Sequence, residues 1–202
     1  GENVVRSPFV TYGDALRVDP AGAEILADVW KPYFNRAYHH FCSHQHTPPE
    51  APADYPAAVQ SGPVIYFAHP VFSMYRRVGQ PLYKELVMNA IRRLMADDLP
   101  VESNLPSTAR LNLLEKDDSL VLHVLHAVPV LRGTNPRNAS KPIEIIEERT
   151  PLHGVRLSMR VGRDIERVYD PVTDEELPFV QDGDRITLEL ECVELHTMLV
   201  LS

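Results

Sequence analysis

The sequence predicts an α/β segment followed by an all-β antiparallel sandwich. Two observations support this division of the 202 residues. Up to about residue 100, strand-like runs alternate with helix-like runs, as in α/β folds. From about Val101 onward, apolar residues recur at every second position between turn signals, which is typical of antiparallel strands. We therefore predict one domain over residues 1–100 and a β-sandwich domain over residues 101–202.

The first long element is expected to be a helix over residues 20–41. Asp19 can cap such a helix, Pro20 suits its first position, and apolar residues recur at helical spacing. Pro32 predicts a break or kink inside it. Residues 42–63 are expected to form a long loop, because prolines cluster at positions 48, 49, 52 and 56. Loops of this length in a compact domain are usually functional or form interfaces.

The next elements are predicted to be a strand and two helices. Pro63–Ala68 is a continuous apolar run, which is typical of a strand buried on both faces of a parallel sheet. A short helix is expected to run through Arg77 and to end before Gly79. Residues 80–96 form the clearest helix, because one apolar stripe runs along them. The stripe consists of Leu82, Leu86, Ala90, Ile91 and Leu94. Two or three strands and two helices are too few for a complete doubly wound domain.

The second half is predicted to contain seven or eight short strands. Alternating apolar residues mark three of them, and turn signals at residues 116–119, 133–136 and 181–184 separate the strands. Such a series without a convincing helix favours an antiparallel sandwich. The alternating sets are Ala109, Leu111 and Leu113; Val155, Leu157 and Met159; and Ile186, Leu188 and Leu190.

The composition excludes some classes of protein. The formal net charge of −8 and the scattered basic residues argue against nucleic-acid binding. No apolar run reaches the roughly 18–20 residues that span a bilayer, so no membrane partner is expected. The two cysteines are far apart in sequence, which favours a reducing compartment and hence the cytoplasm. The chain begins without methionine, which we interpret as a sign that it is part of a longer protein.

A dense group of metal-ligating side chains lies between the predicted helix and the proline-rich loop. It contains His39, His40, Cys42, His44 and His46. Imidazole and thiolate are the preferred ligands of zinc. However, the spacing matches no zinc finger, and ligands so close in sequence do not readily converge on one ion. The alternative is a polar loop whose histidines bind neighbouring groups or line a cleft, and we predict no cofactor, with zinc as the alternative.

A second candidate site follows the predicted buried strand. His69 comes directly after that strand, and ligands of open α/β sheets bind at the carboxyl ends of the strands. Tyr75 and Arg76 follow within two turns and suit contacts with a sugar or a carboxylate. We therefore expect His44, His69, Tyr75 and Arg76 to face a ligand. The competing interpretation of His69 is a buried histidine held by backbone groups.

No catalytic residue is predicted. The chain has no glycine-rich phosphate loop, no G-x-S-x-G motif and no H-E-x-x-H motif. Carboxylates are plentiful in the second half, but they are dispersed over turns and strands. Glu189 and Glu191 share one face of a predicted strand, which is most simply a face exposed to solvent.

Several segments together resemble one known arrangement. They include Tyr33-Phe34, His40–His44, Thr47–Pro49, Val64–Phe72, Tyr83–Leu86, Asn89-Ala90, Leu105–Arg110 and Glu176–Phe179. They resemble the region after the catalytic barrel in glycoside hydrolases related to the family-42 β-galactosidases. The resemblance implies the end of an amidotransferase-like α/β domain with a partial flavodoxin-like sheet, the trimerisation domain, and then a β-sandwich. It also implies that the barrel and its catalytic carboxylates are absent from this chain.

Three functional hypotheses follow. The first is a non-catalytic accessory and oligomerisation region of a glycoside hydrolase. Its partners would be the remainder of that hydrolase, further copies of the chain and a carbohydrate substrate. The second is a stand-alone carbohydrate-binding module, which predicts an exposed aromatic platform. Tyr169 and Phe179 are the only aromatic residues of the second half. The third is a small metal-dependent enzyme that uses the cluster His39–His46.

Overall fold

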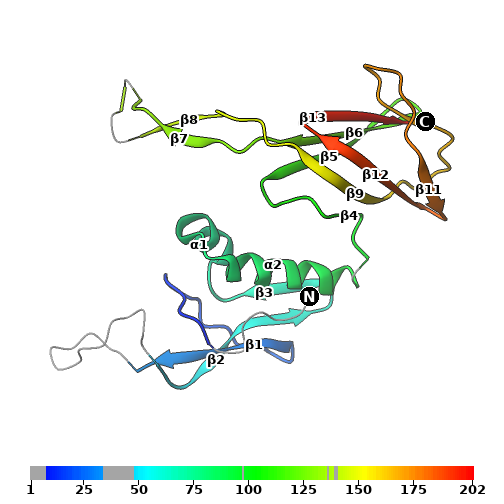
Figure 1. The fold of residues 1–202 in the computed structure, drawn as a ribbon. Coiled ribbons are helices and arrows are strands. Elements are labelled where there is room, and N and C mark those ends of the chain that lie inside the picture. Colours follow the sequence, from blue (N-terminus) through cyan, green and yellow to red (C-terminus); the bar gives the residue numbers. More distant parts are fainter. Residues whose placement is uncertain (1–7, 34–47, 97, 136, 139–140) are drawn as a thin grey trace. The chain divides into compact units, whose positions relative to one another are not determined.

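The computed structural model of the chain describes residues 8–33, 48–96, 98–135, 137–138 and 141–202. The chain divides into two compact units, Gly1–Leu99 and Pro100–Ser202. In the described ranges it consists mostly of antiparallel strands, with two short helices in the first unit (Figure 1). No helix in these ranges is both long and apolar enough to cross a membrane.

The first unit is built on a three-stranded sheet. Strands β1 (Glu24–Pro32), β2 (Pro49–Ser61) and β3 (Val64–Phe67) lie in the order β1-β2-β3. The central strand β2 pairs antiparallel with both neighbours. A tight turn joins β2 to β3, and Gly62 in this turn has a φ of +53°. Glycine suits the position because other residues are strained at positive φ.

The helix predicted over residues 20–41 was wrong in its described part, where strand β1 is found instead. Ile25, Val29 and Trp30 are β-branched or aromatic, and such residues favour a strand. Pairing with β2 therefore gives this segment a strand structure although its apolar residues also fit a helical period. Pro32 ends the strand rather than kinking a helix. Residues 34–41 of the predicted helix lie outside the described residues.

The loop predicted over residues 42–63 was also wrong, because β2 occupies its second part. Pro49, Pro52 and Pro56 suggested a loop, since proline cannot donate a backbone hydrogen bond. These prolines lie in the half of β2 that pairs with β1 alone, whereas β3 pairs only with Ala58–Ser61. This half of β2 has a partner on one side only and its pairing with β1 is irregular, which is where a strand tolerates proline.

Strand β3 confirms the predicted strand but not its predicted setting. It pairs antiparallel at the edge of the sheet, and Val64 and Tyr66 are exposed. A strand buried on both faces of a parallel sheet was therefore the wrong expectation here. The described strands do not confirm a flavodoxin-like sheet.

The two helices predicted after β3 are confirmed. Helix α1 (Val71–Val78) ends where Gly79 takes the left-handed conformation and donates its N–H to the Tyr75 carbonyl oxygen, at 2.9 Å. Helix α2 (Pro81–Leu94) begins with proline at its first turn. Their buried contact is a small cluster of Val71, Met74 and Tyr83. Leu86 of the predicted stripe packs against this cluster, whereas Ile91 and Leu94 are exposed.

The second unit contains two four-stranded antiparallel sheets. Their strand orders are β10-β13-β6-β5 and β11-β12-β9-β4. A two-residue turn with Asp117 at positive φ joins β5 to β6, and Gly183 opens the turn between β11 and β12, as the turn signals predicted. The strands are β4 (Val101–Ser103), β5 (Ala109–Lys116), β6 (Ser119–His126), β9 (Leu152–Arg160), β10 (Val168–Tyr169), β11 (Phe179–Asp182), β12 (Arg185–Val193) and β13 (Leu195–Leu201).

One hydrophobic core fills the space between the two sheets. The predicted period of two is confirmed, because alternate residues of the central strands β6, β9, β12 and β13 are buried. Sheet-on-sheet packing of this kind is a β-sandwich. The core includes Leu122 and Val124 of β6, Val155, Leu157 and Met159 of β9, Ile186, Leu188 and Leu190 of β12, and Leu199 and Leu201 of β13.

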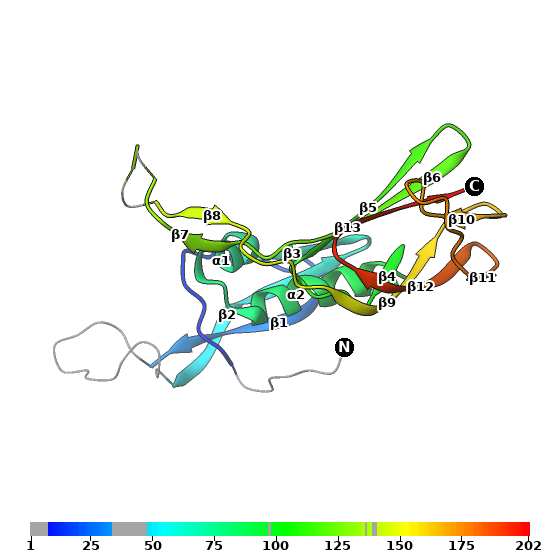
Figure 2. The same cartoon turned by 45° about the horizontal axis from the view of Figure 1, so that its top comes forward.

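A separate ribbon interrupts the sandwich between β6 and β9. Strands β7 (Val130–Arg132) and β8 (Ile143–Ile145) pair only with each other in the described structure. Both views show this ribbon extending away from the two sheets of its own unit (Figure 1, Figure 2). We refer to residues 128–149 as the β7–β8 arm.

Candidate functional site

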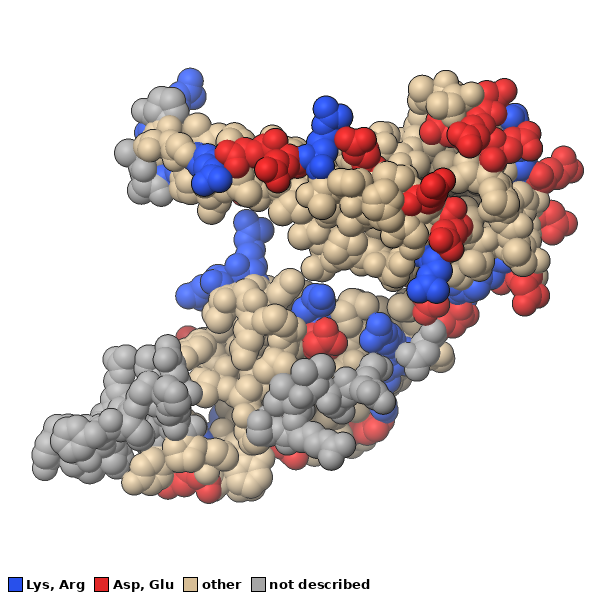
Figure 3. Space-filling view, in the orientation of Figure 1, with Lys and Arg blue, Asp and Glu red and all other residues tan. Residues whose placement is uncertain are grey.

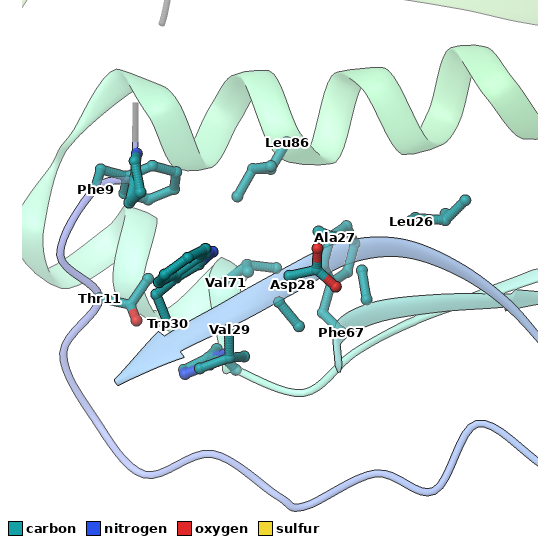
Figure 4. Close-up of a pocket in the computed structure, with 14 residues that line it drawn as sticks. Phe9, Thr11, Leu26, Ala27, Asp28, Val29, Trp30, Phe67, Val71 and Leu86 are labelled. Carbon is teal, nitrogen blue, oxygen red and sulfur yellow. The ribbon is translucent and has the colours of Figure 1, made fainter. Parts of the chain in front are cut away.

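A cavity of about 710 Å³ opens in the first unit. It is lined by side chains of all three strands, both helices and the segment before β1 (Figure 4). Leu86 points into the cavity from α2, and Phe9 points into it from the N-terminal segment. Trp30 projects from β1. Pockets of a few hundred Å³ with mostly apolar walls are the usual form of small-molecule sites.

Two aromatic side chains shape one side of the cavity. Trp30 is 46% exposed although it lines the cavity, so one of its surfaces is open to a ligand. Phe9 packs edge-on against the buried Tyr83, with ring centroids 5.8 Å apart and an interplanar angle of 81°. This edge-to-face contact holds Phe9 in place. Burial raises the pKa of Tyr83, partly offset by the backbone of Tyr12.

Three polar side chains, those of Thr11, Asp28 and His69, also line the cavity. Burial lowers the pKa of His69 below its ordinary value. At neutral pH its ring is therefore uncharged, and it carries one hydrogen-bond donor and one acceptor. A flat aromatic ring with a carboxylate, an imidazole and a hydroxyl suits a sugar, which presents apolar C–H faces and hydroxyl groups. The arrangement is chemically suited to binding.

Of the predicted ligand-facing residues, His69 lines this cavity. Tyr75 and Arg76 are exposed on α1 and are not among the cavity-lining residues, so the structure does not bring them together with His69. The reason is the helical period: Val71 and Met74 take the buried face of α1, which turns Tyr75 and Arg76 outward. His44 lies outside the described residues.

The predicted metal cluster, His39, His40, Cys42, His44 and His46, also lies outside the described residues. Within the ranges that the structure describes, no group of three histidine, cysteine, aspartate or glutamate side chains could hold a metal ion. Cys192 is a free, exposed thiol. A zinc site therefore stays a prediction for residues 39–46.

Trp30, Asp28 and Phe9 were missed by the sequence analysis. Trp30 and Asp28 were assigned to a predicted helix, so their position on one strand was not considered. One signal was available: Trp30 is the only tryptophan of the chain. A single large aromatic beside a carboxylate in a β-prone run deserved consideration as a binding surface.

The sandwich offers no comparable aromatic surface in its described residues. The guanidinium of Arg167 lies 4.2 Å from the centroid of the Tyr169 ring and covers it. Arg167 is held there by Asp174 and Glu176, at 2.9 and 2.7 Å. Phe179 packs against the core. The platform that a stand-alone carbohydrate-binding module requires is therefore not found on the described sandwich strands.

Comparison with solved structures relates the chain to a glycoside hydrolase. The match is to the α-L-fucosidase isoenzyme 2 from Paenibacillus thiaminolyticus, at 32% sequence identity and a TM-score of 0.83. It covers 95% of this chain and 28% of the fucosidase chain, so the chain spans little more than a quarter of that enzyme's length.

Other comparisons add little. A cycloisomaltooligosaccharide glucanotransferase from Paenibacillus sp. aligns at 13% identity over 60% of this chain and 21% of that chain. Its TM-score of 0.31 is too low to indicate a shared fold. No protein-family model matches the chain, and no curated protein matches it.

Proposed function

We propose that this chain is the non-catalytic accessory and oligomerisation region of a larger glycoside hydrolase. The observation that carries the proposal is the fucosidase match, which extends over 95% of this chain but only 28% of that enzyme. The catalytic carboxylates would lie in a barrel domain outside this chain. The amidotransferase-like origin of the first unit, and its kinship with family-42 β-galactosidases, belong to the same proposal.

The surface of the first unit supports a role in assembly. It exposes aromatic side chains along strands, helix and connecting segments, with Phe72 of α1 69% exposed. Large exposed aromatic residues in such number mark surfaces that bind a partner. The set comprises Tyr12, Trp30, Tyr33, Tyr66, Phe72 and Tyr75. In the proposal, the barrel and other copies of the chain cover these side chains except Trp30, whose ring faces the cavity.

The cavity supports a contact with carbohydrate. Trp30 would stack on a sugar ring, and Asp28 and His69 would bind its hydroxyl groups. Because the catalytic groups lie elsewhere, this cavity and the segment of His44 would supply one wall of a sugar site whose chemistry the barrel performs.

Substitutions in the full-length enzyme test this contact. His69→Ala and His44→Ala should raise KM for the sugar substrate, since each removes a hydrogen-bonding group from the wall. The matched control is His153→Ala, because His153 is exposed on β9 of the second unit. Unchanged KM and kcat in both His69→Ala and His44→Ala would refute the contact.

For the parent enzyme we propose an α-L-fucoside as substrate, because the related enzyme is an α-L-fucosidase. The resemblance to β-galactosidases gives the competing expectation, a β-galactoside. Turnover of the two aryl glycosides by the full-length enzyme distinguishes these substrates.

The free, exposed Cys192 supports a cytoplasmic location, since such thiols persist in reducing compartments.

A further inference from the structure

Most of the wall of the cavity in the first unit is apolar. Three of its 14 lining residues, Thr11, Asp28 and His69, are polar, and the other eleven are apolar. A sugar carries hydroxyl groups around its whole ring, and a hydroxyl group buried without a hydrogen-bond partner costs free energy. Three polar side chains can bind the hydroxyl groups of one sugar ring but not those of a second ring as well. The wall therefore selects a ligand that is polar at one end only.

The apolar part of the wall comes from both helices and from β3. Leu86 points into the cavity from α2, Phe67 projects from β3, and Val71 belongs to the first turn of α1. In Figure 4, Thr11 and Trp30 are drawn at one end of the cavity, and Phe67 and Leu86 lie farther along it. Phe67 and Leu86 also pack against the buried cluster of α1 and α2, which fixes their positions. An apolar ring between them would be removed from water, which is favourable.

The volume of the cavity leaves room for such a ring beside a sugar. At about 710 Å³ it lies in the range of about 300–1,000 Å³ that holds drug-sized ligands. A single sugar ring is smaller than a ligand of that size. A sugar that stacks on Trp30 and binds Asp28 and His69 therefore leaves the space bounded by Phe67 and Leu86 unfilled.

The charges around the cavity disfavour an anionic ligand. The carboxylate of Asp28 repels anions, and burial lowers the pKa of His69, so the imidazole offers no positive charge at neutral pH. On the face drawn in Figure 3, basic and acidic side chains both occur over the first unit, so no patch of one sign there attracts a charged ligand. A sugar acid or a sulfated sugar is therefore a poor fit, and a sugar linked to an uncharged apolar group is a good one.

We propose that the space between Phe67 and Leu86 binds the aglycone of the parent enzyme's substrate, which is the group linked to the sugar. The substrate is then a glycoside with an apolar ring as aglycone rather than an oligosaccharide. This inference rests on the proposed contact between the cavity and the sugar, and it adds the class of substrate that this site selects.

Fluorescence titration of the chain tests the assignment. Trp30 is the only tryptophan and lines the cavity, so its emission reports occupation of this site. The probes are phenyl α-L-fucoside, methyl α-L-fucoside and a fucosyl-galactose disaccharide, with excitation at a wavelength that the phenyl group does not absorb. Phenyl α-L-fucoside should bind about 10–100-fold more tightly than the other two, because burial of one phenyl ring is worth about that factor.

Two matched substitutions on α2 locate the phenyl group. Leu86→Gln removes apolar surface from the cavity, so it should weaken binding of phenyl α-L-fucoside about tenfold and leave that of methyl α-L-fucoside unchanged. Leu94→Gln is the control: Leu94 is 42% exposed at the end of the same helix and is not among the cavity-lining residues. Both affinities should stay as in the wild-type chain.

A cavity-filling substitution covers the case in which Leu86→Gln disturbs folding. Ala57 lines the cavity, and Ala57→Leu adds apolar volume there instead of removing it. It should abolish the preference for phenyl α-L-fucoside over methyl α-L-fucoside. Circular dichroism verifies that each variant keeps the secondary structure of the wild-type chain.

Four results would overturn the assignment. They are equal affinities for the phenyl and methyl fucosides, tighter binding of the disaccharide, no binding of the phenyl fucoside, and a phenyl preference that Ala57→Leu leaves intact. The proposed function fails by a different measurement, the turnover of the full-length enzyme. An active parent whose chain shows no phenyl preference rejects the aglycone assignment alone. A full-length protein that hydrolyses no glycoside rejects the proposed function, whatever the isolated chain binds.

Discussion

The two units of the chain bury their apolar residues to very different extents. In the described residues, the sandwich core contains 15 buried side chains, which come from both sheets and from the connection between β9 and β10. The buried cluster of the first unit contains three, Val71, Met74 and Tyr83. The exposed large side chains differ as well. Those described in the first unit include six aromatic residues, whereas those described in the second are all aliphatic.

This contrast indicates a division of roles. The sandwich buries its own core. The first unit leaves one large cavity and six aromatic side chains exposed in its described residues, and in the proposed function these surfaces contact the rest of the enzyme. Hydrophobic burial provides most of the free energy of folding, and a unit with few buried residues is correspondingly marginal.

The largest expected effect is the loss of stability caused by opening a cavity in the sandwich core. Leu157 is 0% exposed, so Leu157→Ala should lower the free energy of unfolding by about 2–5 kcal/mol. The matched control is Leu114→Ala on the outer face of β5, where Leu114 is exposed and the change should stay within about 0.5 kcal/mol. Urea unfolding followed by far-ultraviolet circular dichroism measures both. Equal losses in the two variants would contradict the assignment of the core.

A second, smaller effect tests whether the units unfold separately. Gly62 and Gly183 occupy hairpin turns at positive φ, one in each unit. An alanine at either position should cost about 1 kcal/mol, because a Cβ is strained there. Trp30 is the only tryptophan, so its fluorescence reports the first unit alone. Gly62→Ala should shift the fluorescence transition, and Gly183→Ala should leave it unchanged. A fluorescence shift in Gly183→Ala would show that the units unfold together.

The smallest expected effect is the pH dependence of the first unit. Because the pKa of His69 in the folded chain is below 6.5, the unfolded chain binds more protons between these two values. Stability should therefore decrease as the pH falls through 6.5 and level off below the folded pKa. His69→Gln should flatten this dependence in fluorescence-detected melts. His153→Gln, on an exposed strand position of the sandwich, should retain it.

The two units also differ in how well their sequence patterns predicted their secondary structure. In the sandwich, local period and tertiary burial agree: alternate residues of β9 and β12 face the core, and turn residues mark the hairpins. In the first unit they disagree. The apolar residues of β1 fit a helical period, and the prolines of β2 fit a loop. The pairing between β1 and β2 nevertheless makes both segments strands.

The residues of the candidate site were also predicted only in part. His69 was found because a strand end is a common ligand position, and it does line the cavity. Trp30 and Asp28 were missed because their strand was assigned to a helix. Tyr75 and Arg76 were placed by proximity in sequence, yet the helical period of α1 turns them away from the buried face that carries Val71.

The central proposal is that this chain is an accessory part of a glycoside hydrolase whose catalytic groups lie in another domain. The most direct measurement is hydrolysis of an aryl α-L-fucoside by the full-length enzyme and by residues 1–202 alone, at equal molar concentration. The account predicts turnover by the full-length enzyme and none by the isolated chain. Hydrolysis by the isolated chain, or a full-length protein that hydrolyses no aryl glycoside, would contradict it.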